Sequence, residues 1–367
     1  GLPLNPDFNG ATQEGVGLYQ VTQRAGERFS AAKAYLTPHL GRPNLHVMTG
    51  VTVDRIGLVD GVAKQVHTVQ GGASQVLTAR REIIVSAGAF QSPAILMRSG
   101  IGPAAQLQRL GIEVLHDLPG VGQNLHDHPD VVLVADAPDT SELFGLSLKG
   151  AWKTLNAIFE WRKRRTGQLT TNFAEGGAFY KSTPDAARPD IQLHFVVAKL
   201  VSHGRKLTLG HGYSVHVCLL RPNSRGSVQL ADRNPHSAPL IDPQFLADAE
   251  DVRRMVAGVR QAQRIMAQSA LAAHGREWVA SATARTDAEL EQWIRQNADT
   301  IYHPVGTCRM GQDAMAVVDP QLRVRGVPGL RVVDASVMPS VVSGNTNAPT
   351  IMMAERAADW IRQAVRA

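Results

Sequence analysis

The sequence GAFQSPAILMRSGIG at residues 88–102 comes shortly after the apolar run Ile83–Val85, and together they indicate the fold. The apolar run predicts a strand buried on both faces, as in parallel sheets. Ser92 is a good N-cap, Pro93 suits the first helical position, and Gly100 suits a left-handed C-terminal stop. Strand, small-residue turn and helix in this order are typical of α/β proteins that present backbone amides to a nucleotide.

The sequence on both sides of this unit predicts further strands and helices. Residues 44–88 alternate apolar and polar side chains between glycines, which predicts short strands, the first at 45–50. Residues 131–298 mix apolar segments typical of strands with helical spacing at 247–267. This mixture predicts a second, α+β domain inserted into the first.

Composition excludes several classes of protein. The chain has 367 residues, 44% hydrophobic and 19% charged, which is enough apolar material for a core and argues against disorder. Only two cysteines, Cys218 and Cys308, are present, so a disulfide scaffold is excluded and a reducing, cytoplasmic setting is expected. The formal charge of +6 comes without a nucleic-acid-binding motif, and no segment is suited to span a membrane.

His303 is the first candidate for catalysis. It lies in the segment YHPVGT, where Pro304 keeps it extended and Gly306 permits a close approach of the backbone. A neutral imidazole is a natural general base near neutral pH. The structural alternative is a loop histidine bonded to a carbonyl.

Two segments near the C-terminal end suggest a bound anion or nucleotide. The segment SGNTNAP at residues 343–349 leads into an apolar-faced helix, whose first amides can stabilise an anion such as a reduced flavin ring. Asp334 ends an apolar strand, where nucleotide folds hold sugar hydroxyls. Ordinary helix capping and a turn-forming aspartate are the respective alternatives.

Two other patterns suggest chemistry that we disfavour. The segment HDH at 126–128 has the alternation of a zinc site, but no third and fourth ligands are apparent, so no metal is expected. Instead, the side chains of Asp127 and Asn124 are expected to hydrogen-bond within their own loop and hold its conformation. Cys308 is a candidate thiol nucleophile, but only Arg309 nearby would lower the pKa of its thiol.

Taken together, the chain resembles the glucose–methanol–choline (GMC) family of flavin oxidoreductases, in the branch of bacterial alcohol and choline dehydrogenases. The resemblance rests on five segments that occur in family order: residues 88–102, LPGVGQNLHDHP at 118–129, HPVGT at 303–307, VDAS at 333–336 and GNTNAPTIMMAE at 344–355. The family's N-terminal GxGxxG unit is missing, because no glycine pair here continues in that pattern. The resemblance therefore implies a C-terminal fragment that by itself binds FAD poorly.

The resemblance implies an α/β fold, with a partial FAD-binding Rossmann-like domain and an inserted α+β substrate domain. The implied ranges are 1–130 for the FAD-binding domain, 131–298 for the substrate-binding domain and 299–367 for the C-terminal part of the FAD-binding domain. His303 is then the general base, and Asn345 hydrogen-bonds the substrate oxygen. The residues implied to hold FAD are Val53, Ser86, Ala87, Gly88, Asp334, Ala335, Asn347, Pro349 and Thr350.

The implied reaction is oxidation of a primary, aliphatic alcohol to an aldehyde by hydride transfer to flavin N5, with oxygen or a quinone as electron acceptor. Aromatic content of 5% disfavours a cage for a quaternary ammonium such as choline. Three alternatives stay open: hydroxynitrile cleavage or photodecarboxylation on the same fold, an FAD-free structural fragment, and a basic binding module. Homo-oligomer formation is also left open.

Residues 148–164 predict an amphipathic helix that ends in the basic cluster WRKRR, residues 161–165. Its apolar face is expected to pack on its own domain, as in most surface helices. The alternative is that the helix lies on an anionic membrane surface, at the inner face of the membrane.

Overall fold

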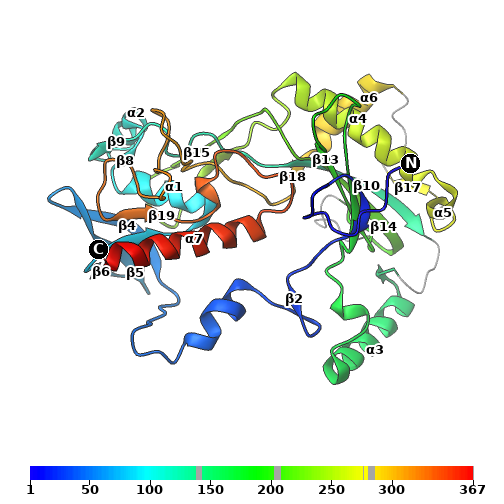
Figure 1. The fold of residues 1–367 in the computed structure, drawn as a ribbon, viewed down its shortest axis with the longest axis horizontal. Coiled ribbons are helices and arrows are strands. Elements are labelled where there is room, and N and C mark those ends of the chain that lie inside the picture. Colours follow the sequence, from blue (N-terminus) through cyan, green and yellow to red (C-terminus); the bar gives the residue numbers. More distant parts are fainter. Residues whose placement is uncertain (138–142, 202–207, 276, 280–285, 367) are drawn as a thin grey trace. The chain divides into compact units, whose positions relative to one another are not determined.

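The computed structural model describes residues 1–137, 143–201, 208–275, 277–279 and 286–366. The chain divides into two units, each built from three segments (Figure 1). Unit 1 contains Gly1–Arg42, Pro129–Asn223 and Leu246–Ile301, and unit 2 contains Pro43–His128, Ser224–Phe245 and Tyr302–Ala367. The predicted domain ranges differ from this division mainly at residues 1–42, which group with unit 1, and at residues 224–245, which group with unit 2.

Unit 1 is built on an antiparallel sheet with the strand order β1-β12-β13-β14-β10-β17, to which β11 and β18 add at the sides. Its strands are β1 (Gly15–Leu18), β2 (Gln23–Arg24), β3 (Glu27–Arg28), β10 (Pro129–Ala137), β11 (Gly145–Leu146), β12 (Gly176–Tyr180), β13 (Ile191–Val196), β14 (Gly210–Leu219), β17 (Glu277–Val279) and β18 (Asp299–Thr300). Short helical turns occur at Ala32–Leu36, Thr37–His39 and Gln168–Thr170. The α-helices are α3 (Leu148–Arg164), α4 (Ala249–Met266), α5 (Ser269–Ala272) and α6 (Asp287–Asn297).

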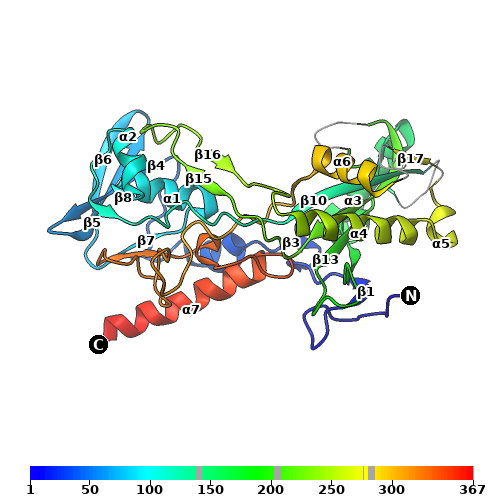
Figure 2. The ribbon, with the colours of Figure 1, turned by 90° about the horizontal axis from the view of Figure 1, so that it is seen from above.

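Helix α4 packs on the sheet of unit 1, against β13 and β14 (Figure 2). Its buried side chains follow the helical spacing that the sequence predicts, with Val252, Met255 and Val259 on the inner side. Helix α6 begins at a capping box formed by Thr286 and Glu289. Both strands and helices thus occur in the region for which the sequence predicts an α+β mixture.

The described part of unit 2 combines four small sheets with three α-helices. Its strands are β4 (Thr52–Val59), β5 (Val62–Gln70), β6 (Ala73–Thr78), β7 (Ile83–Val85), β8 (Ile101–Gly102), β9 (His116–Asp117), β15 (Ser227–Gln229), β16 (Leu240–Asp242) and β19 (Leu330–Val332). The helices are α1 (Gly88–Arg98), α2 (Ala104–Arg109) and α7 (Asn347–Arg366), with a 3-10 turn at Ala335–Val337. Strands β4, β5 and β6 form an antiparallel meander, and β7 pairs with β19 in parallel. The strand predicted at residues 45–50 is wrong, since the first strand of the meander begins at Thr52.

Helix α1 begins one turn earlier than predicted, so Ser92 and Pro93 lie inside it and Ser92 is not the N-cap. Ser92 instead uses its hydroxyl to accept a hydrogen bond from Ala87 N at 3.0 Å. Pro93 has no amide hydrogen for the carbonyl of Ala89, one turn before it. The hydroxyl of Thr307 donates to that carbonyl at 2.6 Å, which compensates for the missing helical bond. The predicted stop holds, because Gly100 follows the helix with φ +76°.

Strand β7 is buried on one face only, contrary to the prediction. Ile83 and Val85 are buried, whereas the side chain of Ile84 between them is 45% exposed. In the described part of the chain, β7 pairs with β19 alone, and alternate side chains of a strand point to opposite faces. The second face of this pair therefore carries an exposed isoleucine.

Helix α3 has the predicted bounds, and Ser147 caps its start by accepting a hydrogen bond from Gly150 N at 2.9 Å. The expectation that its apolar face packs on its own domain is wrong. Only Gly150 and Ala157 of this helix are buried, whereas Leu148, Trp152, Leu155 and Phe159 are exposed. None of the described helices is both long and apolar enough to cross a membrane.

Candidate active site

His303 is held by a second segment of unit 2. The backbones of His126 and Val305 form an antiparallel bridge, with N–H···O distances of 3.0 and 2.8 Å. Asp127 accepts hydrogen bonds at Oδ1 from the amides of His128 and His303, at 2.8 and 3.0 Å. The HDH segment thus fixes the backbone on which the candidate base is carried.

The ring of His303 lies against the ring of His128, with the two Nδ1 atoms 3.0 Å apart and the ring planes at 87°. On its other side, His128 places Nε2 3.0 Å from the carbonyl oxygen of Val342. A carbonyl only accepts, so Nε2 of His128 carries a hydrogen, and Nδ1 of the neutral ring is an acceptor. His303 then donates its Nδ1–H to His128, and its own Nε2 carries the lone pair.

That lone pair faces Asn345, whose Nδ2 lies 3.3 Å from Nε2 of His303. Burial lowers the pKa of His303 from 6.5 to about 4, because desolvation disfavours the imidazolium. The ring is therefore neutral near pH 7, with its basic nitrogen beside an amide donor. The two residues predicted for catalysis are brought together by the structure.

The loop after β7 and the turn after β19 meet at Asp334. Its Oδ2 accepts hydrogen bonds from Gly88 N at 2.9 Å and from the Ser92 hydroxyl at 2.5 Å. Its Oδ1 accepts from Ser336 N at 2.8 Å. Asp334 therefore holds both turns in place and caps the 3-10 turn that begins at Ala335.

The segment Ser86–Gly88 leaves room for a bound group. Ser86 and Ala87 are exposed, and Gly88 has φ +79°. A Cβ at Gly88 would meet no atom within 4 Å, so its backbone faces open space. The amides of Ala87 and Gly88 donate within the protein, to the Ser92 hydroxyl and to Asp334 Oδ2, so the segment offers an open backbone surface that a nucleotide can approach closely. The assignment of these residues to FAD stays a prediction.

The other predicted cofactor residues are more dispersed within unit 2. Asn347 and Pro349 lie in the first turn of α7, and Thr350 uses its hydroxyl to donate to Thr346 O at 2.7 Å. Val53 lies on β4, half-buried, and its carbonyl accepts a hydrogen bond from Arg98 at 3.4 Å. No contact that the structure shows joins Val53 to the other predicted cofactor residues.

Neither disfavoured chemistry gains support from the geometry. His126 accepts a hydrogen bond at Nδ1 from Val341 N at 2.9 Å, so its ring fixes backbone. Within the described ranges, His, Cys, Asp and Glu side chains nowhere form a group of three or more that could hold a metal ion. Cys308 is fully buried, and this burial raises the pKa of its thiol well above the ordinary value.

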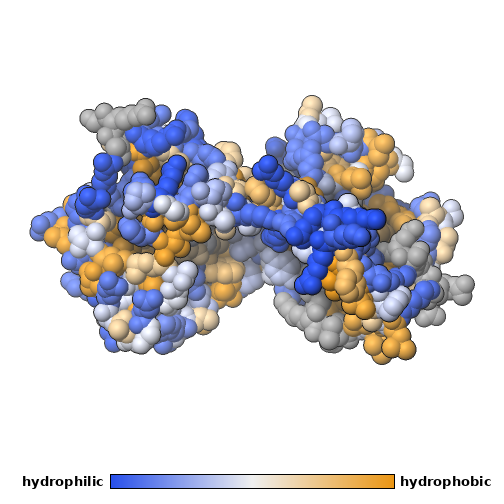
Figure 3. Space-filling view, turned by 90° about the horizontal axis from the view of Figure 1, so that it is seen from below, coloured by the Kyte–Doolittle hydropathy of each residue, from blue (hydrophilic) through white to orange (hydrophobic). Residues whose placement is uncertain are grey.

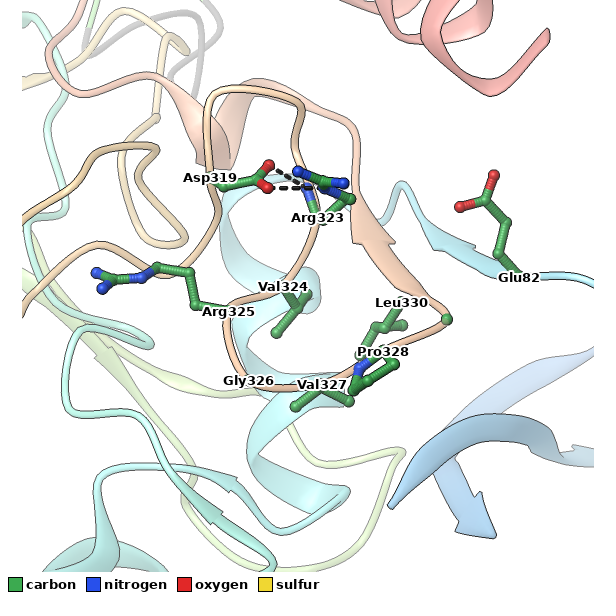
Figure 4. A pocket seen from close by; sticks show the side chains of 10 residues that line it. Glu82, Asp319, Arg323, Val324, Arg325, Gly326, Val327, Pro328 and Leu330 are labelled. Carbon is green, nitrogen blue, oxygen red and sulfur yellow. Dashed lines mark hydrogen bonds and ion pairs between the residues drawn. The ribbon is translucent and has the colours of Figure 1, made fainter. Parts of the chain in front are cut away.

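A separate hollow of about 320 Å³ lies beside β19, around the loop at residues 324–329. Figure 4 shows Asp319 and Arg323 joined on one wall, with an Nε–Oδ2 distance of 2.7 Å, and Arg325 pointing away from them. None of the predicted site residues lines this hollow. We therefore assign it no part in catalysis.

Sequence reasoning missed the contribution of His128. The HDH segment is noticeable in the sequence, but its two histidines resemble either zinc ligands or loop residues. The contact with His303 joins positions 175 residues apart, which no local pattern encodes. A signal was available in the motif HDHP and the motif HPVGT considered together, as two histidine segments that flank the inserted unit.

Comparison with known proteins gives a consistent result. Family models described as GMC oxidoreductase match residues 1–130 and residues 222–354. The chain is 46% identical to "Alcohol dehydrogenase [acceptor]" of Pseudomonas putida, over 98% of this chain and 66% of that protein. It is 43% identical to the mitochondrial choline dehydrogenase of Homo sapiens, over 99% of this chain and 61% of the relative. The chain thus spans somewhat less than two thirds of these relatives.

A solved structure extends the likeness to the fold. Formate oxidase from Aspergillus oryzae RIB40, studied for modification of its FAD, aligns with a TM-score of 0.90 and 27% identity. The alignment covers 99% of this chain and 68% of that one. The predicted α/β fold class is therefore confirmed.

Proposed function

This chain belongs to the GMC oxidoreductase family of FAD-dependent enzymes that act on CH–OH groups, and on that premise we propose that its protein oxidises a primary, aliphatic alcohol to an aldehyde. The observation that supports the proposal is the neutral His303, whose Nε2 lies 3.3 Å from the Asn345 amide. A general base beside a hydrogen-bond donor is what removal of a hydroxyl proton requires.

In the proposed reaction, the alcohol donates its hydroxyl hydrogen to Nε2 of His303. The Asn345 amide donates to the substrate oxygen and orients it as negative charge develops. His128 receives the Nδ1 hydrogen bond of His303 and keeps that ring in the basic tautomer. The FAD group, when bound, supplies the acceptor for the hydride that leaves the alcohol carbon. Loss of one proton and one hydride turns the alcohol into the aldehyde.

The residues that would hold FAD are those with open backbone near Asp334. Gly88 and the exposed Ser86 and Ala87 would lie along the nucleotide, and Asp334 would keep their turn in place. The start of α7 at Asn347 would add the positive end of a helix dipole. Val53 and Thr350 remain proposed contacts, of the adenine and of the flavin part respectively.

Two features of the proposal concern substrate and acceptor. The two relatives are named for an alcohol and for choline, and the low aromatic content of this chain favours an uncharged aliphatic alcohol. The electron acceptor is oxygen or a quinone. Neither cysteine forms a disulfide and both are buried, which is compatible with a reducing compartment, and we propose that the protein works in the cytoplasm.

The test uses the full-length protein with aliphatic alcohols and choline, assayed with oxygen and with a quinone analogue. His303→Gln is expected to lower kcat on the order of a hundredfold or more, while FAD stays bound. Flavin absorption and the melting temperature give the control for cofactor and fold. Near wild-type turnover in this variant would refute the assignment of the base, and turnover of choline alone would refute the aliphatic substrate.

A further inference from the structure

Helix α3 presents its large apolar side chains to the outside. Four of them recur at spacings of three and four residues, and their exposed fractions are 94% for Leu148, 65% for Trp152, 45% for Leu155 and 65% for Phe159. Residues at this spacing share one face of a helix. A helix that covers its own domain would bury such a face.

The two fully buried residues of α3 lie on its opposite face. Gly150 and Ala157 are the residues of this helix that are buried, and both lie about half a turn away from the exposed apolar row. The fully buried contacts of α3 with its own unit are thus made by a glycine and an alanine, and the half-buried Trp161 adds a hydrogen bond to Gly26 O near the end of the helix. This arrangement is the reverse of the one that the amphipathic pattern predicts.

The apolar surface continues beyond the helix. A shallow hollow of about 660 Å³ runs along the start of α3, and its lining includes Leu146, Leu148 and Leu209, all exposed. In Figure 3, α3 lies on the side facing the viewer, and hydrophobic side chains gather over it beside hydrophilic ones. The patch is thus wider than a single row of residues.

The C-terminal end of α3 is firmly attached and strongly basic. Trp161 donates from Nε1 to Gly26 O at 2.7 Å, and the Arg165 guanidinium lies 4.0 Å from the centre of the Trp161 ring. Arg165 also pairs with Glu27 at 3.2 Å, so its charge is used within the unit. The remaining cations of the basic end, Arg162, Lys163 and Arg164, are exposed.

We propose that α3 is a peripheral binding surface for an anionic lipid bilayer, with its apolar row at the acyl boundary and its basic end on the headgroups. An exposed apolar row next to cations is the pattern of interfacial helices, whose binding grows with the buried apolar area and with attraction to anionic lipids. The charge favours lipid over a second copy of the chain, because α3 carries five basic side chains and one acidic one. Two copies would bring like charges together, whereas anionic headgroups complement them.

The test measures co-sedimentation with vesicles of phosphatidylcholine alone and of phosphatidylcholine with 30% phosphatidylglycerol. The wild-type protein is expected to bind the anionic vesicles and to shift its tryptophan emission to the blue. The triple variant Arg162→Gln, Lys163→Gln, Arg164→Gln is expected to bind them about a hundredfold more weakly. The double variant Trp152→Ser, Phe159→Ser removes the apolar anchor and is expected to lose binding by tenfold or more.

Matched control variants distinguish an effect specific to α3 from a general effect of lost positive charge or lost apolar surface. Exposed arginines outside α3 are replaced together in Arg253→Gln, Arg323→Gln, Arg362→Gln, which changes the net charge equally. Leu240→Ser, Ile241→Ser removes an exposed apolar pair on β16. Both controls should bind like the wild type.

Three results would overturn the proposal. The first is that the wild-type protein does not bind anionic vesicles at low salt, and the second is that the variants and the controls lose vesicle binding equally. The third is a stable dimer that only the Trp152→Ser, Phe159→Ser variant disrupts. Light scattering and circular dichroism on each variant establish its mass and its fold. Alcohol turnover plays no part in this measurement, so failure of the proposed function would not affect its outcome.

Discussion

The Nδ1 atoms of His128 and His303 lie 3.0 Å apart, and one hydrogen between them settles which nitrogen of His303 is basic. The Val342 carbonyl accepts from the far side of His128, which leaves His128 as the acceptor in this pair. The orientation of a base by a second residue in this way is common in enzymes that use histidine. In the proposed reaction His128 is a positioning residue, because it acts through His303.

Replacement of His128 by Asn or by Gln is expected to show which of its two hydrogen bonds matters for turnover, because each substitute can keep a different one. An Asn side chain places its amide oxygen near the former Nδ1, whereas Gln reaches only the former Nε2. His128→Gln should therefore lower kcat/KM by about tenfold to a hundredfold, and His128→Asn should restore part of the loss. Nitrogen-15 NMR of the imidazoles measures the tautomer of His303 directly.

A purely structural role for His128 would give another pattern. Both variants would then lose thermal stability to a similar degree, and His303 would keep its hydrogen on Nδ1 in each. The assignment of the His303 signals comes from the spectrum of His303→Gln. Restoration of activity by Asn without restoration of the tautomer would contradict the positioning role.

The buried His303 predicts an unusual pH dependence. Because its pKa is lowered to about 4, kcat/KM for a neutral alcohol should stay constant as the pH falls through 6.5 and should decline only near pH 4–5. A pH profile of kcat/KM checks this. An acidic limb centred near 6.5 would show that the ring is solvated as an ordinary histidine.

Stability should also depend on pH through the same residue. The unfolded chain binds a proton at His303 below pH 6.5 and the folded chain only below about 4, so the folded state is fully favoured above 6.5 and loses stability between 6.5 and 4. The loss at pH 4.5 relative to pH 7 amounts to about 2–3 kcal/mol. Urea unfolding should show it in the wild type, and His303→Gln should lack this increment.

Asp334→Asn is expected to loosen the turn that we assign to the cofactor. The substitution replaces one acceptor oxygen by a donor that faces Gly88 N or Ser336 N. Loss of charge-assisted hydrogen bonds in a buried site costs about 2–3 kcal/mol, and FAD should be retained less well. Asp359→Asn, in an exposed ion pair with Arg362, is the control and should change stability by less than about 1 kcal/mol.

The bond between Thr307 and Ala89 can be tested by a double-mutant cycle. Thr307→Val leaves the Ala89 carbonyl without the hydroxyl donor, at a cost of about 1–3 kcal/mol. Pro93→Ala supplies a helical N–H to that carbonyl, so the same substitution should cost less in this background. Equal costs in the two backgrounds, measured by thermal unfolding, would show that the hydroxyl does not replace the helical bond.

The sequence predicts those features that depend on local chemistry. The bounds of α3, the capping box of α6 and the stop at Gly100 follow from residues within one turn of each other. The start of α1 was mispredicted, because Ser92 bonds to Asp334, 242 residues away, in addition to its local backbone. Burial of Ile84 was mispredicted for a similar reason, since burial depends on which strands pair and not on the strand itself.

In the candidate site, too, the sequence predicts what depends on local motifs and does not predict what depends on tertiary contacts. His303 and Asn345 were selected by motif and resemblance, and their proximity across 42 residues agrees with that selection. The position of His128 and the tautomer of His303 depend on a tertiary contact, so only the structure supplies them. For α3, periodicity gave the apolar face correctly, but the identity of what covers that face is not encoded in periodicity.

The hydrogen-bonded histidine pair also bears on how the protein is made. His128 and His303 lie on either side of the large insertion of unit 1, so the first partner is synthesised 175 residues before the second. At translation rates of 5–20 residues per second this interval is on the order of ten seconds or more. During that time unit 2 is incomplete on the ribosome, and the inserted unit has time to fold first. His303 can therefore gain its final orientation only late in biosynthesis, because its partner His128 is made first and the pair forms only after the insertion has been synthesised.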